Sequence, residues 1–119
     1  MDERAQRWNR FISDICMRDA AALSDLQRQA FICFWYDAEI QNGGQCAYFD
    51  SERYASPAET EAALRLIGTE EIADNFRKAV TEGRKDDWMH TDNAYYAFSP
   101  SLFDCLTAFV ETHKDTILN

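Results

Sequence analysis

The chain has 119 residues, which suits one domain over residues 1–119. Apolar residues make up 46% of it, enough for one core, so a disordered chain is excluded. The formal net charge of −9 argues against direct binding to nucleic acid or an anionic membrane, because both are negative, and no apolar run is long enough to span a bilayer.

Residues 2–17 predict a first helix. Trp8, Phe11, Ile12 and Ile15 recur at three- and four-residue spacing, which places them on one apolar stripe. We expect this helix to pack on the core like a lid.

A second helix is predicted from Ser24, its N-cap, to about Gln41, with Gly43 following as a left-handed stop. Residues 31–36 are apolar nearly all round, so this helix is expected at the centre of the domain. A strand is the alternative for so short a run, but both flanks continue with good helix formers. Residues 45–54 then predict a short helix or turn.

Two helices are predicted next, on either side of a tight corner. Ser56 caps the first of them, Glu59 is expected to complete a capping box, and the helix ends at Gly68. Thr69 caps the second, which ends before Gly83. The expected buried stripe of this second helix is Ile72, Phe76 and Val80.

The C-terminal part predicts a loop and then a last helix. Residues 84–98 have no clear period and are interpreted as a loop with at most one helical turn. Ser99 and Pro100 give a cap-then-proline start for the last helix. Its expected apolar face comprises Leu102, Leu106, Phe109, Val110, His113 and Ile117. The chain is therefore predicted to be all-α, a compact bundle of five or six helices around a central apolar helix.

Cofactor motifs are missing from the sequence. Gly43-Gly44 is not followed by the Lys-Ser/Thr pair of a phosphate loop. Cys16, Cys33, Cys46 and Cys105 lack the paired spacing of zinc or redox sites, so reduced core thiols in a cytoplasmic protein are expected. We expect no cofactor, no metal and no catalytic residue.

One segment leaves an enzymatic alternative open. Asp86, Asp87, His90 and Asp92 lie close together in sequence and could hold a divalent metal or act in acid-base chemistry. The competing interpretation is a solvated acidic loop held by Trp88, which interrupts the pattern of a cation-binding loop.

The excess of acidic over basic residues accumulates after the second helix, whereas residues 1–30 carry equal numbers of both. Carboxylates one helical turn apart are spaced so that helices can imitate a row of DNA phosphates, although acidity can also serve solubility alone. The predicted partner-binding residues are Asp50, Glu52, Glu59, Glu61, Glu70, Glu71, Asp74, Asp86, Asp87 and Asp92.

A stretch from the central helix onward resembles the DNA-mimic protein family typified by a small acidic neisserial protein. The motif residues are Glu39, Asn42, Gly43, Gly44, Tyr48 and Phe49, followed by an Ala-Leu-x-x-Ile-Gly segment at 63–68. The chain departs from the family pattern at Gln45, Ala47 and Ser51-Glu52. The Asn-Gly-Gly corner itself is interpreted as structural rather than as a ligand loop, and Gly43→Val is expected to strain it.

The resemblance implies an acidic homodimer whose surface charge resembles double-stranded DNA. It also implies binding to a basic DNA-binding protein, a helix-turn-helix transcription regulator, in place of that protein's DNA site, without catalysis. The alternatives are an immunity or anti-defence inhibitor of a basic nuclease, and a non-catalytic acidic scaffold or dimerisation module. A dimer is also predicted from aromatic residues in excess of one small core: Trp8, Phe11, Tyr95, Tyr96 and Phe98.

Overall fold

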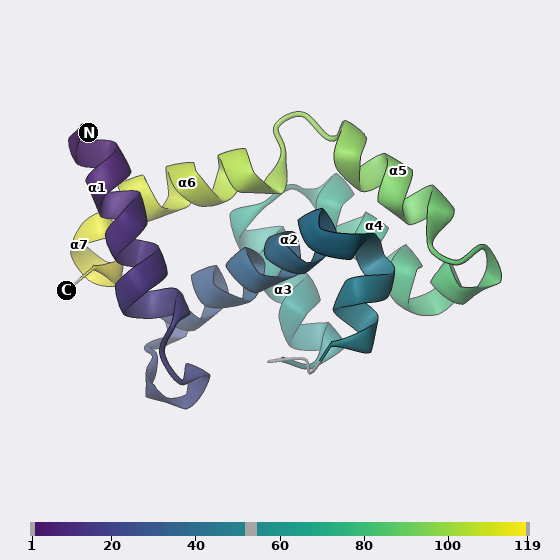
Figure 1. The fold of residues 1–119 in the computed structure, drawn as a ribbon, viewed down its shortest axis with the longest axis horizontal. Helices are drawn as coiled ribbons and strands as arrows, with labels where there is room; N and C mark the ends of the chain where they lie inside the picture. The colour runs from purple at the N-terminus through teal and green to yellow at the C-terminus, as the bar shows by residue number, and fades with distance from the viewer. Residues whose placement is uncertain (1, 52–54, 119) are drawn as a thin grey trace.

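The computed structural model describes residues 2–51 and 55–118, and all regular structure in these ranges is helical (Figure 1). The all-α prediction is therefore confirmed. The described ranges contain seven α-helices, joined by one π-helical turn and two 3-10 turns. In chain order the elements are α1 (Glu3–Arg10), η1 (Phe11–Cys16), η2 (Ala20–Ala22), α2 (Asp25–Asp50), α3 (Pro57–Ile67), α4 (Glu70–Glu82), η3 (Gly83–Lys85), α5 (Met89–Ala97), α6 (Leu102–Thr112) and α7 (Lys114–Ile117).

Helix α2 is the central element, as its apolar sequence predicts. It crosses the middle of the molecule and packs against α3, α5, α6 and α7, while α1 and η1 cover its N-terminal half (Figure 1). Phe31, Tyr36 and Ile40 on this helix are almost completely buried. Both chain ends lie at one end of the molecule and α5 at the other, so the two halves of α2 have different neighbours.

The predicted N-caps at the start of α2, α3 and α4 are confirmed. The hydroxyl of Ser24 accepts the backbone N–H of Gln27 at 3.3 Å, and the Ser56 hydroxyl accepts that of Glu59 at 3.1 Å. Thr69 does the same at the start of α4. The expected capping box at Ser56 is wrong, because the Glu59 carboxylate turns to the Arg28 guanidinium of α2, and a charged donor is a stronger partner than a backbone amide.

The buried stripe of α4 differs from the prediction at one position. Ile72 and Phe76 are buried, but Val80 is 42% exposed and Ala79 takes its place in the interior. The reason is Trp88, whose indole N–H donates to the carbonyl of Ala79 at 3.0 Å. This ring fills the space beside the last turn of α4, so the small residue faces inward.

The region predicted as a loop contains the nine-residue helix α5. Its sequence has no apolar period because only Thr91 and Tyr95 on it are buried. The last helix begins later than predicted, with Ser101 rather than Ser99 as the cap, because the Ser101 hydroxyl accepts the N–H of Asp104. It ends at Thr112, and the separate turn of α7 follows.

The four cysteines occupy two kinds of environment. Cys16 and Cys33 are buried, as expected of core thiols, whereas Cys46 and Cys105 are only partly buried. All four are free thiols.

Candidate protein-binding surface

The Asn-Gly-Gly corner breaks α2 into two segments. Gly43 has φ −161° and ψ 23°, and Gly44 has φ 75° and ψ −172°, so the helix changes direction at this point. The prediction of a left-handed stop at Gly43 is wrong, because only Gly44 has a positive φ, and the extended φ of Gly43 is open to any residue. The backbone strain expected of Gly43→Val therefore belongs to position 44.

Helix α5 attaches to the backbone of α2 on both sides of this break. The backbone N–H of Gln45 donates to Asp92 Oδ1 at 2.8 Å, and the Tyr96 hydroxyl donates to the carbonyl of Ile40 at 2.6 Å. A Cβ atom on Gly44 would lie 2.6 Å from Asp92 Oδ2. Glycine is thus required at position 44 by its φ and by the close approach of a carboxylate.

The side chain of Gln45, where the chain departs from the family pattern, lies in the core. It is completely buried, and its Oε1 accepts a hydrogen bond from the Tyr36 hydroxyl at 2.9 Å. Its Nε2 has no hydrogen-bond partner among the described residues. Burial raises the pKa of Tyr36, so this hydroxyl remains protonated and donates. At position 45, where the chain departs from the family pattern, a polar side chain therefore lies in the core.

The other motif residues divide between core and surface. Tyr48 is buried and shares a hydrogen bond with Thr60, and Phe49 packs partly buried against the core. The Asn42 side chain is exposed and Glu39 is partly so. The structure gives no packing reason for the identity of Glu39 or Asn42.

Three of the predicted partner-binding residues, Asp50, Asp87 and Asp92, lie near enough to Cys46 for their charges to act on its thiol. Asp50 accepts a hydrogen bond from the Cys46 thiol at 3.4 Å. This bond raises the pKa of Cys46, and desolvation and then the negative charges of Asp50, Asp87 and Asp92 raise it further. We call Asp50, Asp87 and Asp92 the acidic edge.

The two segments that carry the acidic edge are joined by ring stacking. Phe49 stacks on Trp88 with centroids 5.4 Å apart and an interplanar angle of 11°. Asp50 and Asp87 are the sequence neighbours of these two rings, so the stack brings residues from distant parts of the chain to one place. In the part of the chain that the structure describes, Asp50 and Asp87 form no ion pair.

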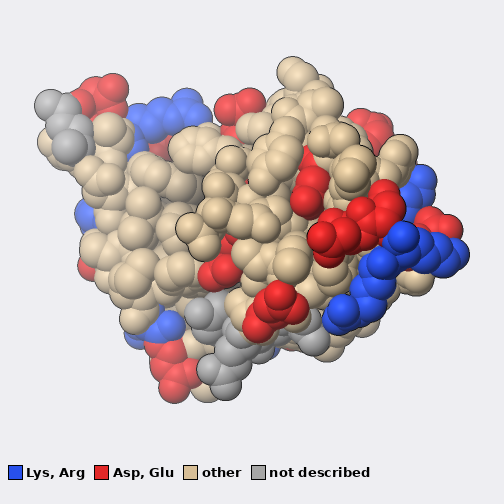
Figure 2. Space-filling view, turned by 45° about the vertical axis from the view of Figure 1, so that its right-hand side comes forward, with Lys and Arg blue, Asp and Glu red and all other residues tan. Residues whose placement is uncertain are grey.

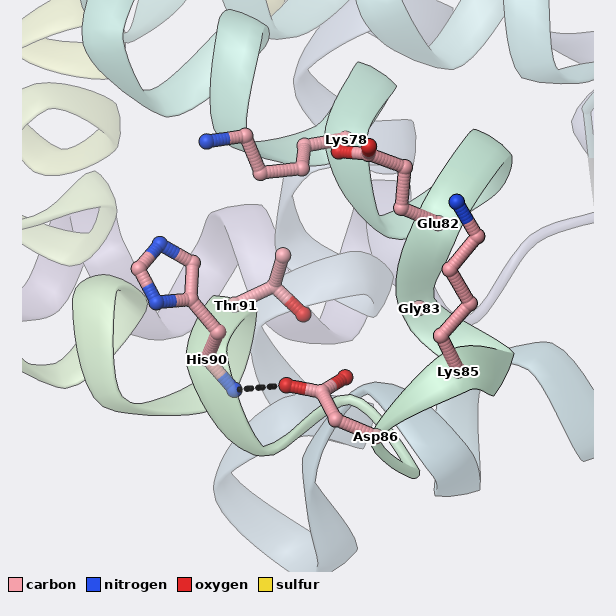
Figure 3. A pocket seen from close by; sticks show the side chains of 7 residues that line it. All are labelled: Lys78, Glu82, Gly83, Lys85, Asp86, His90 and Thr91. Atoms are coloured by element: carbon pink, nitrogen blue, oxygen red, sulfur yellow. Dashed lines mark hydrogen bonds between the residues drawn. The ribbon is translucent and has the colours of Figure 1, made fainter.

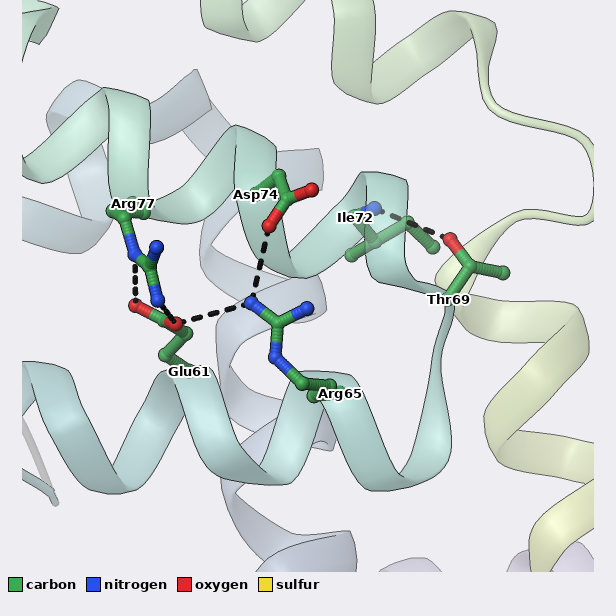
Figure 4. A network of polar contacts seen from close by, with 6 residues as sticks. All are labelled: Glu61, Arg65, Thr69, Ile72, Asp74 and Arg77. Atoms are coloured by element: carbon green, nitrogen blue, oxygen red, sulfur yellow. Dashed lines mark hydrogen bonds and ion pairs between the residues drawn. The ribbon is translucent and has the colours of Figure 1, made fainter.

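A second group of the predicted residues is engaged in ion pairs between helices. Glu61 binds Arg65 and Arg77, and Arg65 also binds Asp74, so one network joins α3 to α4 (Figure 4). Hydrogen bonds from arginine lower the pKa of Glu61, as the bond from Arg28 lowers that of Glu59. The charges of these carboxylates are largely balanced.

The remaining predicted residues lie elsewhere. Glu70 and Glu71 are exposed in the first turn of α4, where the positive end of the helix dipole favours them. Asp86 accepts the backbone N–H of His90 at 2.9 Å. Glu52 lies outside the described residues. Figure 2 shows acidic side chains as separate groups, with lysine and arginine beside some of them, rather than as one continuous patch.

The segment proposed for metal binding does not converge on one point. Asp86 binds the backbone of His90 rather than facing its imidazole, and Asp92 faces the corner of α2. Over residues 2–51 and 55–118, no three His, Cys, Asp or Glu side chains are placed to hold a metal ion. Within the described residues, the segment therefore does not supply the group of ligands that the metal-binding hypothesis requires.

A hollow of about 320 Å³ lies beside this segment (Figure 3). Lys78 and Lys85 line it together with Glu82, Asp86 and His90, so the side chains around it carry both signs of charge. No helix in the described ranges is long and apolar enough to cross a membrane.

A comparison with known protein families finds a match for most of the chain. The sequence model of a family described as DMP19-like protein matches residues 21–116, which include α2 through α6, the corner and the acidic edge. No curated protein and no solved structure matches the chain.

Proposed function

The chain belongs to the DMP19-like protein family, and we propose that it acts as a mimic of double-stranded DNA that binds a basic DNA-binding protein and blocks its DNA site. A helix-turn-helix transcription regulator is the proposed partner. The observation that carries the proposal is the family match over residues 21–116, since it includes both the corner motif and the carboxylates around it.

The acidic edge supports this proposal physically. A protein surface evolved for phosphates presents lysine and arginine, which attract carboxylates that have no basic partner of their own. Asp50 and Asp87 meet this condition within the described ranges, as do Glu70, Glu71 and Asp86, whereas Glu59, Glu61 and Asp74 are already paired with arginine. Because the Phe49–Trp88 stack also ties Asp50 and Asp87 to the family motif, we assign the partner contact to these two residues of the acidic edge.

We propose binding rather than catalysis. Burial raises the pKa of the Cys16 and Cys33 thiols, so both stay protonated and are poor nucleophiles. The Cys46 pKa is raised as well, by its bond to Asp50. The proposed compartment is the cytoplasm, where a transcription regulator would be met.

We also propose a homodimer, and this proposal rests on the resemblance to the DNA-mimic family. The argument from surplus aromatic residues is weaker than expected, because Phe11 and Tyr95 are buried in the core of the single chain. Tyr96 is 54% exposed, so it remains available for a dimer interface. A molar mass of two chains in light scattering at micromolar concentration would support the dimer, and a mass of one chain would remove it.

The test of the proposed function compares two variants of equal net charge. Asp50→Asn/Asp87→Asn neutralises the acidic edge, and Asp14→Asn/Asp115→Asn neutralises two exposed carboxylates, in η1 and α7, at the opposite end of the chain's fold. The wild-type chain is used to capture its partner from host lysate, and the purified partner is then titrated with each chain.

We expect the captured partner to be a DNA-binding protein that its own duplex DNA and high salt each release from the chain. The edge variant should bind at least about tenfold more weakly and the control variant within about threefold of wild type. Equal weakening by both variants would show that net charge alone is recognised, and a partner that duplex DNA does not displace would overturn mimicry. If the captured partner is a nuclease that the chain inhibits, the immunity alternative would replace the proposal of a transcription regulator.

A further inference from the structure

We propose that Asp92 is a positioning residue of the acidic edge, which holds the second segment of α2 against α5 and so places Asp50 beside Asp87. It was predicted to contact the partner, but its geometry assigns it to the fold. This inference rests on the proposed function for its meaning, although the positioning itself can be measured without a partner.

Both oxygens of the Asp92 carboxylate face the corner of α2. Oδ1 accepts the N–H of Gln45, and Oδ2 lies so near Gly44 that a Cβ there would be 2.6 Å away. The side chain is only partly exposed. Asp92 thus acts as an N-cap supplied by another helix, because it binds the first amide after the break.

Three residues, Trp88 at the N-cap of α5 and Asp92 and Tyr96 within it, share this attachment and form one face toward α2. Asp92 and Tyr96 are four residues apart, a spacing that aligns side chains on a helix. Trp88 stacks on Phe49 near the end of the second segment, and Tyr96 binds the carbonyl of Ile40 before the break. The face therefore holds α2 at three successive points, and Asp92 is the middle one.

The position of Asp50 depends on this attachment. Asp50 is the last residue of α2 and is separated from the first segment by the break at Gly43 and Gly44. Without the bond at Gln45, the start of the second segment would lose its anchor to α5, while buried Tyr48 and the stacking of Phe49 on Phe76 and Trp88 would still hold its end. The acidic edge would then be less rigidly placed, and a surface that must match regularly spaced cations would lose part of its preorganisation.

The chemistry predicts what a substitution must preserve. The N–H of Gln45 requires an acceptor, and an asparagine Oδ1 supplies one without charge. A positioning role is therefore rescued by asparagine and lost with alanine. A direct ionic contact with a basic partner would be lost with both.

The experiment combines amide hydrogen exchange with partner affinity for Asp92→Asn, Asp92→Ala and Tyr96→Phe. In Asp92→Ala we expect the amides of residues 45–50 to exchange at least about tenfold faster, with amides of α6 unchanged as an internal control. Asp92→Asn should stay within about threefold of wild type in exchange and in affinity, while Asp92→Ala loses about tenfold in affinity. Tyr96→Phe keeps the cap and should speed exchange at the same amides by a smaller factor. This variant provides the measurement if Asp92→Ala does not fold.

The outcomes separate the two hypotheses. Unchanged exchange at residues 45–50 in both Asp92→Ala and Tyr96→Phe would overturn the positioning role. Equal loss of affinity in Asp92→Asn and Asp92→Ala would make Asp92 a contact residue instead. If wild type binds no DNA-binding protein, the proposed function fails, and the exchange rates still decide whether Asp92 positions the segment.

Discussion

Replacing Gly44, a buried residue of the α2 corner, by alanine is expected to be among the most destabilising single changes outside the apolar core. The residue has φ 75° and ψ −172°, a region of backbone space that only glycine enters without strain. An added methyl group would also lie 2.6 Å from Asp92 Oδ2, so the carboxylate must move away.

The magnitude follows from these two effects. Holding alanine in this backbone region costs about 2 kcal/mol. Displacing the carboxylate that accepts the Gln45 N–H costs about 2 kcal/mol more, since the acceptor is charged. The sum of about 4 kcal/mol is a large part of the total stability of a small domain. It corresponds to a fall in Tm of roughly 15 °C for a chain of this length.

Urea unfolding followed by circular dichroism measures this loss. Gly43→Ala is the matched control, because φ at Gly43 is −161° and the added Cβ meets only the Cβ of Ala47, at 2.9 Å. We expect it to cost about 1 kcal/mol. Gly44→Ala/Asp92→Ala should cost less than the sum of its two single changes, because both remove the same bond. A midpoint for Gly44→Ala equal to that of Gly43→Ala would refute the reasoning.

Two further predictions concern carboxylates. Arginine holds the pKa of Glu59 and Glu61 below the ordinary value of 4.5, so the stability that they contribute is complete above that pH and is lost as the pH falls through the lowered values. Urea midpoints should drop below about pH 4.5 in wild type and drop less in Glu61→Gln; equal slopes would contradict this. In a Cys105→Ser background, Asp50→Asn should speed alkylation of Cys46 at about pH 8 by about threefold, because the bond to Asp50 raises the thiol pKa; an unchanged rate would show that the bond does not hold the thiol.

Local signals in the sequence account for the parts of the fold that were predicted correctly. A hydroxyl that caps the N–H three residues later acts within one turn, so Ser24, Ser56 and Thr69 can be recognised without knowledge of the fold. Helix α5 was missed because it buries so little of itself that no apolar period appears. Its stability comes from contacts with α2 and α4, which sequence spacing does not record.

The candidate site was predicted in composition but not in arrangement. Glu61 and Asp74 belong to different helices, and only the packing of α3 on α4 brings Arg65 between them. Asp92 was counted with the surface carboxylates, although it serves the backbone of α2. The four-residue spacing of Trp88, Asp92 and Tyr96 was a signal in the sequence that could have indicated one common helix face.

The distribution of arginine, rather than the net charge, decides which carboxylates can attract a basic partner. A carboxylate bound to arginine contributes little to the field beyond a Debye length of about 8 Å, because the pair is nearly neutral. Neutralising Glu61 would therefore free Arg77, leave Arg65 with Asp74 alone and weaken the α3–α4 contact, so any effect on partner binding would come through the fold. Neutralising Asp50 removes a charge that no described cation balances. Under the proposed function, a surface that imitates DNA requires carboxylates without a basic partner on a fixed framework; among the described residues, the proposed framework is the corner of α2 held by α5.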